Sequence, residues 1–508
     1  MMIETLLAVT FAGALLTFLA PNRIAGKLAF AISLIPAGLS LWLFTMFDGS
    51  GNALLEGGEL AFENQITWIS LGAYEISWYV GLDGISLPLV VLTTVLTTLA
   101  IVSSWTPIDM RESQFYGLVL FIEANLIGVF VALDFFMWFI FWEAVLIPMY
   151  LLIGVWGGPR RKYAAIKFFI YTNVASLVMF GAFISLVFSL DVTSFALPEI
   201  TQAMHNGGPG EFAGFAGTTV ASVIFVAMFL GFAVKVPVVP FHTWLPDAHV
   251  EAPTPASVLL AGVLLKMGTY ALLRFNFTMF PDQVTSMAFA IPIAAIAVIS
   301  VIYGAMLALA QTDLKRIVAY SSVSSMGYVI LGLIAYTHFG VGGATFQMVS
   351  HGLISGLMFM AVGVVYNATH TRMVTDMSGL ADKMPIAVGI LIAGAFAYMG
   401  LPLMSGFYGE FTIFFGSFGS ELTYAPLFTA LAMFGIVIVA GYLLFALQRT
   451  VFGPYRLDTD YSVGRAPLHD VMPMFVLLGL IILLGVVPEL IFEMIHDAVD
   501  PILTGGDL

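Results

Sequence analysis

Long apolar stretches separated by short polar segments make up most of this chain. A helix needs about 20 apolar residues to cross a bilayer, and a window of that length predicts about fourteen spanning helices. They run approximately over residues 3–20, 28–46, 84–104, 115–133, 135–154, 163–190, 218–245, 254–275, 285–310, 315–336, 341–367, 384–418 (interrupted), 425–449 and 471–495. The pattern therefore predicts an all-α polytopic membrane protein.

Composition supports this class and excludes several kinds of functional site from the chain. Hydrophobic residues make up 60% of the chain, charged residues only 9%, and the mean hydropathy is +1.01, so most of the chain must lie in lipid. Cysteine is absent, which excludes thiolate ligation of iron–sulfur clusters and catalytic thiols. The sequence has no phosphate-binding glycine loop, and its eight histidines show no metal-site spacing. We predict no cofactor, metal or nucleic-acid site in this chain.

The loop charges indicate the topology. If the N-terminus lies outside, most of the 17 Lys and Arg residues fall in inside loops, including the 157–162 cluster, Lys315 and Arg465. Arg274 then falls in an outside segment. The positive-inside rule therefore predicts an even number of spans with both termini on the outer side of the cell membrane. The net charge of −14 comes largely from outer acidic residues such as Asp48, Glu56, Glu59, Glu63 and Glu75.

Four ionisable side chains lie deep inside apolar stretches: Glu143, Lys235, Lys266 and Glu410. A charge at the bilayer centre costs about 3 kcal/mol on insertion scales, so such a residue is a functional candidate. The four residues together suggest a route for protons or cations through the membrane.

Glu143 lies midway along its predicted helix, and Glu123 is a second buried acid twenty residues earlier. One interpretation is a protonated carboxyl that makes an interhelical hydrogen bond. The other is a carboxylate whose charge depends on a nearby cation, which would make it a proton-affinity switch. For Glu123 we leave the two interpretations open.

Lys235 is followed by Pro237 and Pro240, which cannot continue regular helical hydrogen bonding. A helix break inside a membrane is tolerated where protein or a water-filled cavity covers the freed backbone, so we expect Lys235 to lie beside water. Movement of Glu143 relative to this lysine could load or unload a proton. The alternative is a static pair that joins two helices. His242, just after the break, is either a proton carrier or a core histidine.

Lys266 lies about a dozen residues into its predicted helix, too far from the end for its amine to reach the interface easily. We interpret it as a central proton relay, with a structural pair as the alternative. His351, in the middle of another span, suits proton transfer near neutral pH or serves as a core histidine. His249 is expected at the inside surface or at a helix cap.

Glu410 follows a second predicted helix break that contains Gly400, Pro402, Gly406 and Gly409. Broken helices in corresponding places of two halves are typical of inverted repeats with a transport path between them. We therefore predict two inverted repeats of five helices with two broken helices. The predicted domains are 1–114 (three helices and an acidic outer loop), 115–275 and 285–450 (the repeats), and 451–508 (a loop and the last helix).

Four segments of the chain resemble the antiporter-like, proton-pumping membrane subunits of respiratory complex I. They are FWEAVLIPMYLLIGVWGG, KVPVVPFHTWLPDAHVEAPTPASVLLAGVLLKMGTYALLR, DLKRIVAYSSVSSMGYV and GLPLMSGFYGEF. The resemblance covers approximately residues 80 to 450. Within the family the match is best to the subunit 4 type, chain M, because other members usually carry lysine where this chain has Glu410.

This resemblance implies a half-channel in each repeat and a polar axis at mid-membrane. It assigns Glu143 as the partner of Lys235, Lys266 as the central relay, Glu410 as the terminal acid, and His351 as an axis residue. Many relatives read SSVSHMG where this chain reads SSVSSMG, so Ser325 occupies a usual histidine position. Either water and Tyr320 complete the link, or the proton path differs there.

The resemblance also implies partners. Quinone, NADH or another electron donor, flavin and iron–sulfur clusters would belong to partner subunits, and chains L and N would lie on either side of this chain in the lipid bilayer. Two alternatives remain: a subunit of a multisubunit cation/proton antiporter, and a non-transporting scaffold of a membrane redox complex.

Overall fold

The computed structural model describes residues 1–55, 60–461, 463–464 and 466–504. Glu56, Glu59 and Arg465, to which the sequence assigned sides of the membrane, lie outside the described residues. The α-helices are α1 Met2–Leu19, α2 Asn22–Thr45, α3 Ser86–Ser103, α4 Glu112–Val131, α5 Phe135–Ala144, α6 Leu146–Trp156, α7 Arg161–Ser189, α8 Leu197–His205, α9 Gly217–Lys235, α10 Trp244–Glu251, α11 Thr254–Leu259, α12 Leu265–Ala271, α13 Pro281–Thr285, α14 Met287–Leu309, α15 Leu314–Ala335, α16 His338–Thr369, α17 Pro385–Tyr398, α18 Ser405–Phe418, α19 Ala425–Val451, α20 Leu468–Val486 and α21 Glu489–Thr504.

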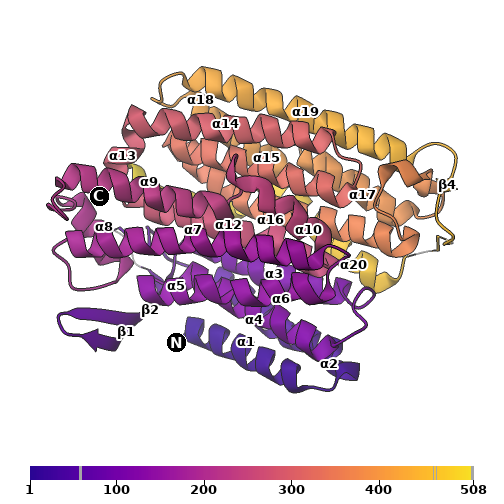
Figure 1. Cartoon of the computed structure of the whole chain (residues 1–508), viewed down its shortest axis with the longest axis horizontal. Helices are drawn as coiled ribbons and strands as arrows, with labels where there is room; N and C mark the ends of the chain where they lie inside the picture. The colour runs from indigo at the N-terminus through magenta and orange to yellow at the C-terminus, as the bar shows by residue number, and fades with distance from the viewer. Residues whose placement is uncertain (56–59, 462, 465, 505–508) are drawn as a thin grey trace.

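The helices run side by side along the long axis of the molecule (Figure 1). Among the described residues, 13 helical segments are long and apolar enough to cross a membrane. The predicted 384–418 span is a further, interrupted crossing made of α17 and α18, each 14 residues long. The prediction of an all-α polytopic membrane protein is therefore confirmed, and the chain is a multi-pass membrane protein.

The centre of the bundle is formed by α16 and by the segment that contains α11 and α12. The apolar windows of both crossings are completely buried, whereas α1 and α2 leave most of theirs exposed. Helix α16 packs against α15, α17, α18, α20 and α21. Large apolar side chains are exposed along the outer helices, for example Leu15, Val437 and Phe434. Such a surface is suited to contact with lipid tails.

Four predicted helices differ from the observed ones. The span predicted at 135–154 is divided between α5 and α6 at Val145, and the span predicted at 218–245 ends at Lys235. The helix predicted at 254–275 contains two π-helical stretches, Leu260–Leu264 and Leu272–Thr278. The span predicted at 471–495 ends at Val486, because Pro488 follows and cannot donate a backbone hydrogen bond there. The separate helix α21 begins at Glu489.

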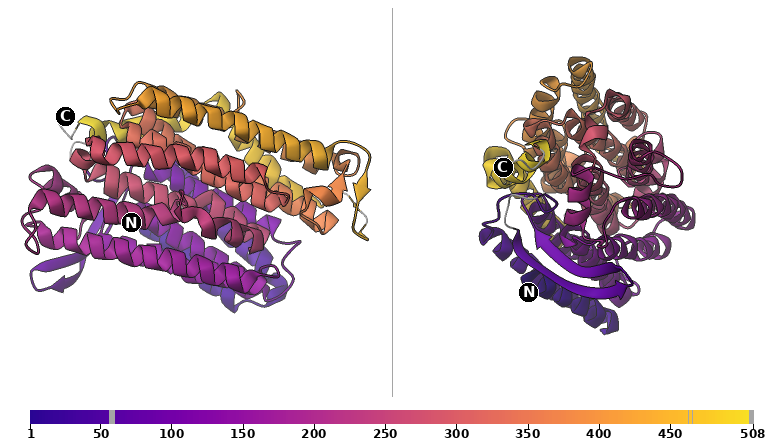
Figure 2. Two further views of the ribbon diagram at one scale, coloured as in Figure 1. Left: turned by 45° about the horizontal axis from the view of Figure 1, so that its top comes forward. Right: turned by 90° about the vertical axis from the view of Figure 1, so that its left-hand side faces the viewer.

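The predicted outer loop contains an antiparallel hairpin of β1 Ala61–Leu71 and β2 Tyr74–Leu82. Gly72, at φ +64°, provides the positive φ that suits the two-residue turn between the strands. A scan for long apolar windows cannot detect such strands, because their polar and apolar residues alternate. The hairpin lies across one end of the bundle (Figure 2). A second sheet is very short and pairs β3 Met377–Ser378 with β4 Arg456–Leu457.

Both ends of the chain lie toward the hairpin end of the bundle (Figure 1). This arrangement agrees with an even number of crossings. The Asn52 amide donates to the Ala498 carbonyl at 2.8 Å, and the Tyr336 hydroxyl donates to the Ile502 carbonyl at 2.9 Å, so α21 is held against this end. The division into two inverted repeats stays a prediction.

Candidate functional site

Lys235 is the last residue of α9, at the predicted helix break. Its chain continues through Pro237 and Pro240 into the short helix α10, so the regular hydrogen-bonding pattern stops beside the lysine. The side chain is 1% exposed, and its Nζ lies 3.7 Å from the centre of the Trp142 ring. Nζ has no hydrogen-bond partner among the described residues. A cation–π contact therefore holds this buried amine.

Glu143 follows Trp142 in the last turn of α5 and lies close enough to Lys235 to act on its charge through space. No ion pair within 4.0 Å joins the two side chains among the described residues. Instead, one Glu143 oxygen is 3.5 Å from the Asn173 amide, and the other is buried without a partner. The structure thus brings the predicted partners near each other and leaves them separated.

Lys266 lies at the centre of the bundle and is completely buried. Its Nζ is 2.6 Å from His351 Nδ1 on α16 and donates to the Ala261 carbonyl at 2.7 Å. Ala261 belongs to the π-helical stretch just before Lys266, where the wider turn changes the usual hydrogen-bonding of the backbone. The structure therefore joins two of the predicted residues, Lys266 and His351, by a direct hydrogen bond.

The hydrogen-bonded line continues from His351 to a residue that the sequence reasoning missed. His351 Nε2 is 3.0 Å from the hydroxyl of Tyr398, the last residue of α17, and this hydroxyl is 3.4 Å from Ser322 Oγ on α15. Tyr320 does not lie on this line; its ring is near His242, 6.4 Å away between centres. Ser325 is buried on α15, one turn beyond Ser322. Tyr398 was not singled out because it reads as one more aromatic residue in an apolar helix.

Glu410 lies in α18 and is 5% exposed. The break before it, residues 399–404, is shorter than predicted, because Gly406 and Gly409, which the sequence placed in the break, belong to α18. The Glu410 carboxylate interacts through space with the hydroxyls of Tyr328, Tyr398 and Tyr442. Gly400, at φ +65°, faces this carboxylate: a Cβ built there would lie 2.6 Å from Glu410 Oε2. The helix break that contains Pro402 therefore makes room for a carboxyl group inside the membrane.

Three other residues that the sequence singled out, His242, Glu123 and His249, are buried. His242 is buried beside Tyr303, with ring centres 5.7 Å apart. Both Glu123 oxygens are buried without a hydrogen-bond partner among the described residues, which is unusual for a side chain with only a structural role. The surface position expected for His249 is wrong, because its ring is completely buried and stacks on Phe359 at 4.6 Å.

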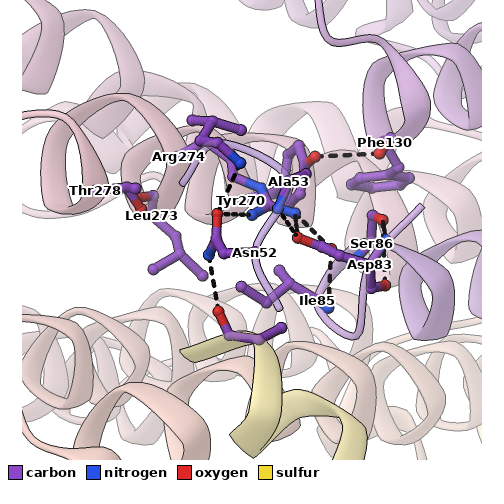
Figure 3. Close-up of polar contacts among 12 residues, drawn as sticks. Asn52, Ala53, Asp83, Ile85, Ser86, Phe130, Tyr270, Leu273, Arg274 and Thr278 are labelled. Atoms are coloured by element: carbon purple, nitrogen blue, oxygen red, sulfur yellow. Dashed lines mark hydrogen bonds and ion pairs between the residues drawn. The ribbon is translucent and has the colours of Figure 1, made fainter. Parts of the chain in front are cut away.

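Two basic residues assigned to loops are buried as well. Lys315, expected in an inside loop, is 4% exposed, and its Nζ donates to the Ala252 carbonyl at 2.7 Å. Arg274, expected in an outside segment, is 1% exposed, and its Nη2 donates to both carboxylate oxygens of Asp83, each at 2.6 Å (Figure 3). Both residues lie at helix ends, where the boundary error of a sequence-based assignment is largest.

Asp83, just before α3, is also held by backbone N–H groups. It accepts bonds from Ala53 at 2.9 Å, Ile85 at 3.1 Å and Ser86 at 2.9 Å. Burial would raise the pKa of the Asp83 carboxyl, but the Arg274 guanidinium and these N–H groups hold the pKa below its ordinary value. The pair is therefore charged, and it joins the hairpin end of the helical segment that carries Lys266 to the start of α3.

A histidine cluster lies at the same end, although the sequence spacing indicated no metal site. His338 begins α16, and His496 and Asp500 are one turn apart on α21. Their possible ligand atoms all lie within 4.8 Å of one another. His338 Nδ1 is 2.5 Å from Asp500 Oδ1, and the two imidazole rings stack with centres 5.3 Å apart. The separation of the first residue from the other two by more than a hundred positions hid the cluster from a scan of spacing.

Residues 132–438 match the family model described as "NADH:quinone oxidoreductase/Mrp antiporter, TM". The chain is 38% identical to F(420)H(2) dehydrogenase subunit M of Methanosarcina mazei, over 96% of this chain and 94% of that protein. It is 39% identical to NADH-quinone oxidoreductase subunit M of Rhodobacter capsulatus, over 94% of this chain and 90% of that protein.

The structure is similar to a chain of respiratory complex I from Thermus thermophilus solved with bound NADH. The TM-score is 0.86 at 26% sequence identity, and the match covers 99% of both chains. The similarity therefore extends beyond the residues of the family model to both ends of the fold.

Proposed function

The chain belongs to the family of antiporter-like membrane subunits shared by NADH:quinone oxidoreductases and Mrp antiporters, and we propose that protons cross it along its buried ionisable residues. It is a proton-translocating membrane subunit of the complex I type, subunit M or chain 4. The proposed path runs from Glu143 and Lys235 through Lys266 and His351 to Glu410. In this proposal 115–275 and 285–450 form two half-channels that meet at Lys266.

The observation that carries the proposal is the hydrogen bond between Lys266 and His351, both completely or almost completely buried at the centre of the bundle. A lysine in lipid-like surroundings is costly, and a purely structural pair would favour a carboxylate as its partner. A histidine is instead a partner that can itself accept and release a proton. This contact supports a transfer function over a fixed ion pair.

Glu143 and Lys235 are proposed as the switch that loads this relay. At an effective dielectric constant near 20, a unit pair 4 Å apart interacts by about 4 kcal/mol. That free energy changes a proton affinity by roughly a thousandfold, at 1.36 kcal/mol for each factor of ten. Glu143 now contacts Asn173, and Lys235 contacts Trp142. A small movement that replaces these contacts by a direct Glu143–Lys235 ion pair would therefore raise the proton affinity of Lys235.

The assembly around the chain is part of the proposal. We assign no redox step to this subunit; quinone, NADH or another electron donor, flavin and iron–sulfur clusters belong to partner subunits. The M. mazei relative, by its name, belongs to an F(420)H(2) dehydrogenase, so the donor differs within the family. We expect chains L and N beside this one, the cell membrane as its location, and both termini on the outer side.

The test uses the assembled complex in sealed proteoliposomes. Glu143→Ala and Lys235→Ala should each abolish acidification coupled to quinone reduction and lower the rate of quinone reduction, while assembly is preserved. The exposed residues Glu421 and Lys383 provide matched controls, and their alanine variants should pump normally. A correctly assembled Glu143→Ala complex with an unchanged number of protons per electron pair would refute the assignment.

The second candidate function is that of a cation/proton antiporter subunit, since the family model covers Mrp antiporters as well. Mass spectrometry of the intact complex isolated through this chain separates the two functions. Flavin and iron–sulfur subunits in the complex support the oxidoreductase, whereas a complex with small membrane partners alone supports the antiporter.

A further inference from the structure

Tyr398 lies between His351 on α16 and Ser322 on α15. It ends α17, directly before the break, and its side chain is buried. Its hydroxyl is within hydrogen-bonding distance of His351 Nε2 on one side and of Ser322 Oγ on the other, at 3.0 and 3.4 Å. Ser325, at the position where relatives usually carry a histidine, cannot titrate near neutral pH.

The hydrogen bonds can all point in one direction. A protonated Lys266 has no acceptor on its amine, so it donates to His351 Nδ1, and the neutral imidazole then carries its hydrogen on Nε2. Nε2 donates to the Tyr398 oxygen, which leaves the phenolic hydrogen free to point at Ser322. A hydroxyl that accepts on one side and donates on the other is suited to pass a proton without becoming ionised.

We infer that Tyr398 is the proton relay between His351 and the Glu410 half-channel. The inference rests on the proposed function. In one transfer, Nζ of Lys266 gives a proton to Nδ1 of His351 while Nε2 loses its own to the Tyr398 oxygen. The phenolic proton passes to the Ser322 oxygen, and the hydroxyl proton of Ser322 moves on toward the Glu410 carboxylate. Every group except the donor and the final acceptor ends with its original number of protons.

The surroundings of the tyrosine support a route toward Glu410. Tyr398 and Glu410 are both buried, and Gly400, two residues after Tyr398, faces the Glu410 carboxylate, with a Cβ built there 2.6 Å from Oε2. Helix α15 adds a second buried hydroxyl pair nearby, where Tyr442 donates to Ser321 Oγ at 2.6 Å. Hydroxyl groups from three helices therefore line the region between the central relay and the terminal acid.

The experiment compares Tyr398→Phe with Tyr336→Phe in the assembled complex. Each change removes one tyrosine hydroxyl, but the Tyr336 hydroxyl donates to the Ile502 carbonyl at 2.9 Å, which cannot pass a proton on, and it lies outside the proposed path. Tyr398→Phe should reduce the number of protons pumped per electron pair and slow pumping at least tenfold, with thermal stability close to that of Tyr336→Phe. Tyr336→Phe should pump at the normal stoichiometry.

Lys266→Ala, measured in parallel, distinguishes failure of the tyrosine relay from failure of the proposed proton path. Pumping lost in Lys266→Ala and retained in Tyr398→Phe overturns the tyrosine relay and leaves the proposed path standing. Pumping retained in both variants overturns the path itself. Equal loss of pumping in Tyr398→Phe and Tyr336→Phe also overturns the relay, because it indicates a general effect of removing a tyrosine hydroxyl from the bundle.

A second inference concerns the cluster of His338, His496 and Asp500, which is independent of the proton path. Two imidazoles and a carboxylate are a ligand set that zinc and similar divalent transition metals favour. Ligand atoms in a tetrahedral zinc site lie roughly 3.4 Å apart, given bonds of about 2.1 Å, so the present contacts of 2.5 to 4.8 Å need small adjustments. His338 also lines an open pocket of about 380 Å³, which gives an ion a way in.

The geometry points to a divalent transition-metal site that clamps α21 to the start of α16. At neutral pH the purified complex should take up one equivalent of Zn²⁺ that His496→Ala and Asp500→Ala complexes lack, and Zn²⁺ should raise the melting temperature of the unmodified complex only. His205→Ala is the matched control, since His205 lies toward the same end and its Nε2 is 2.9 Å from the Thr278 carbonyl, away from the cluster. Equal zinc content in the unmodified and cluster-variant complexes would mean an ordinary His–Asp ion pair and overturn the site.

Discussion

Replacing Asp83 should destabilise the subunit far more than replacing its partner Arg274. Without Asp83, the buried guanidinium keeps the Asn52 amide oxygen, at 3.2 Å, and the Tyr270 ring, with its centre 5.1 Å away, but it loses its anionic partner, and its Nε already lacks a hydrogen-bond partner among the described residues. Without Arg274, the Asp83 carboxylate keeps three backbone N–H donors. Removal of one member of a buried pair costs about 3–5 kcal/mol. We expect the loss of unfolding free energy to be at or above this range for Asp83→Ala and below it for Arg274→Met.

The double variant Asp83→Ala/Arg274→Met completes the cycle. It leaves no uncompensated charge, so it should recover much of the stability lost in Asp83→Ala. The exposed pair Arg456–Asp458, at 60% and 52% exposure, is the matched control, and its removal should cost less than about 1 kcal/mol. The assay is thermal unfolding of the solubilised complex, in which a loss of 4 kcal/mol lowers the midpoint by on the order of 4 °C.

The pH dependence of this pair follows from the lowered pKa of Asp83. A carboxyl with a folded pKa below the unfolded value stabilises the protein fully at higher pH, and the stabilisation is lost as pH falls through the folded pKa. The difference between the unmodified complex and Asp83→Ala should therefore be constant from about pH 6 to 8. The reasoning is refuted if Asp83→Ala unfolds within 1 °C of the unmodified complex, or if Arg274→Met is the more damaging change.

Two further predictions concern the polar path. Gly400→Ala places a Cβ 2.6 Å from Glu410 Oε2 at a positive φ, so pumping should slow severalfold; Gly389→Ala, which meets open space, should not slow it, and equal rates would contradict the steric argument. Trp142→Leu removes the ring 3.7 Å from Lys235 Nζ, a contact worth about 2 kcal/mol when desolvated. The proton affinity of Lys235 should fall roughly thirtyfold, so the pH at which pumping declines on the alkaline side should be lower in Trp142→Leu than in the unmodified complex. An unchanged pH profile would count against the contact.

The sequence predicted the membrane class and the positions of both large helix breaks for simple physical reasons. Apolar length is sufficient to recognise a crossing, and Pro237 and Pro240 cannot be accommodated in a regular helix. The central residues Lys266 and His351 stood out because a charge or an imidazole in lipid is rare. The family resemblance placed both residues on the polar axis, but their contact was not predicted, because they are 85 positions apart and belong to different helices.

Other parts of the site could not be predicted in this way. Tyrosine and serine are common in apolar helices, so only the contacts of Tyr398 with His351 and Ser322 identify these residues as part of the site. The separation of Glu143 from Lys235 depends on where Asn173 and Trp142 lie, and the sequence does not encode that distance in any local pattern. Lys315 and Arg274 were expected in loops and are buried, because charge counting places every basic residue near a helix end outside the bundle; their sides of the membrane stay a prediction.

The π-helical stretch Leu260–Leu264 sets the direction in which the Lys266 side chain points around the helix axis. A π turn accommodates roughly one residue more than an α turn, and each residue rotates an α-helix by about 100°. Loss of a single residue from this stretch would let the backbone relax to an ordinary helix and turn the lysine away from His351, although no charged side chain had been changed. This segment should therefore accept substitutions of apolar residues far more readily than any change in its length.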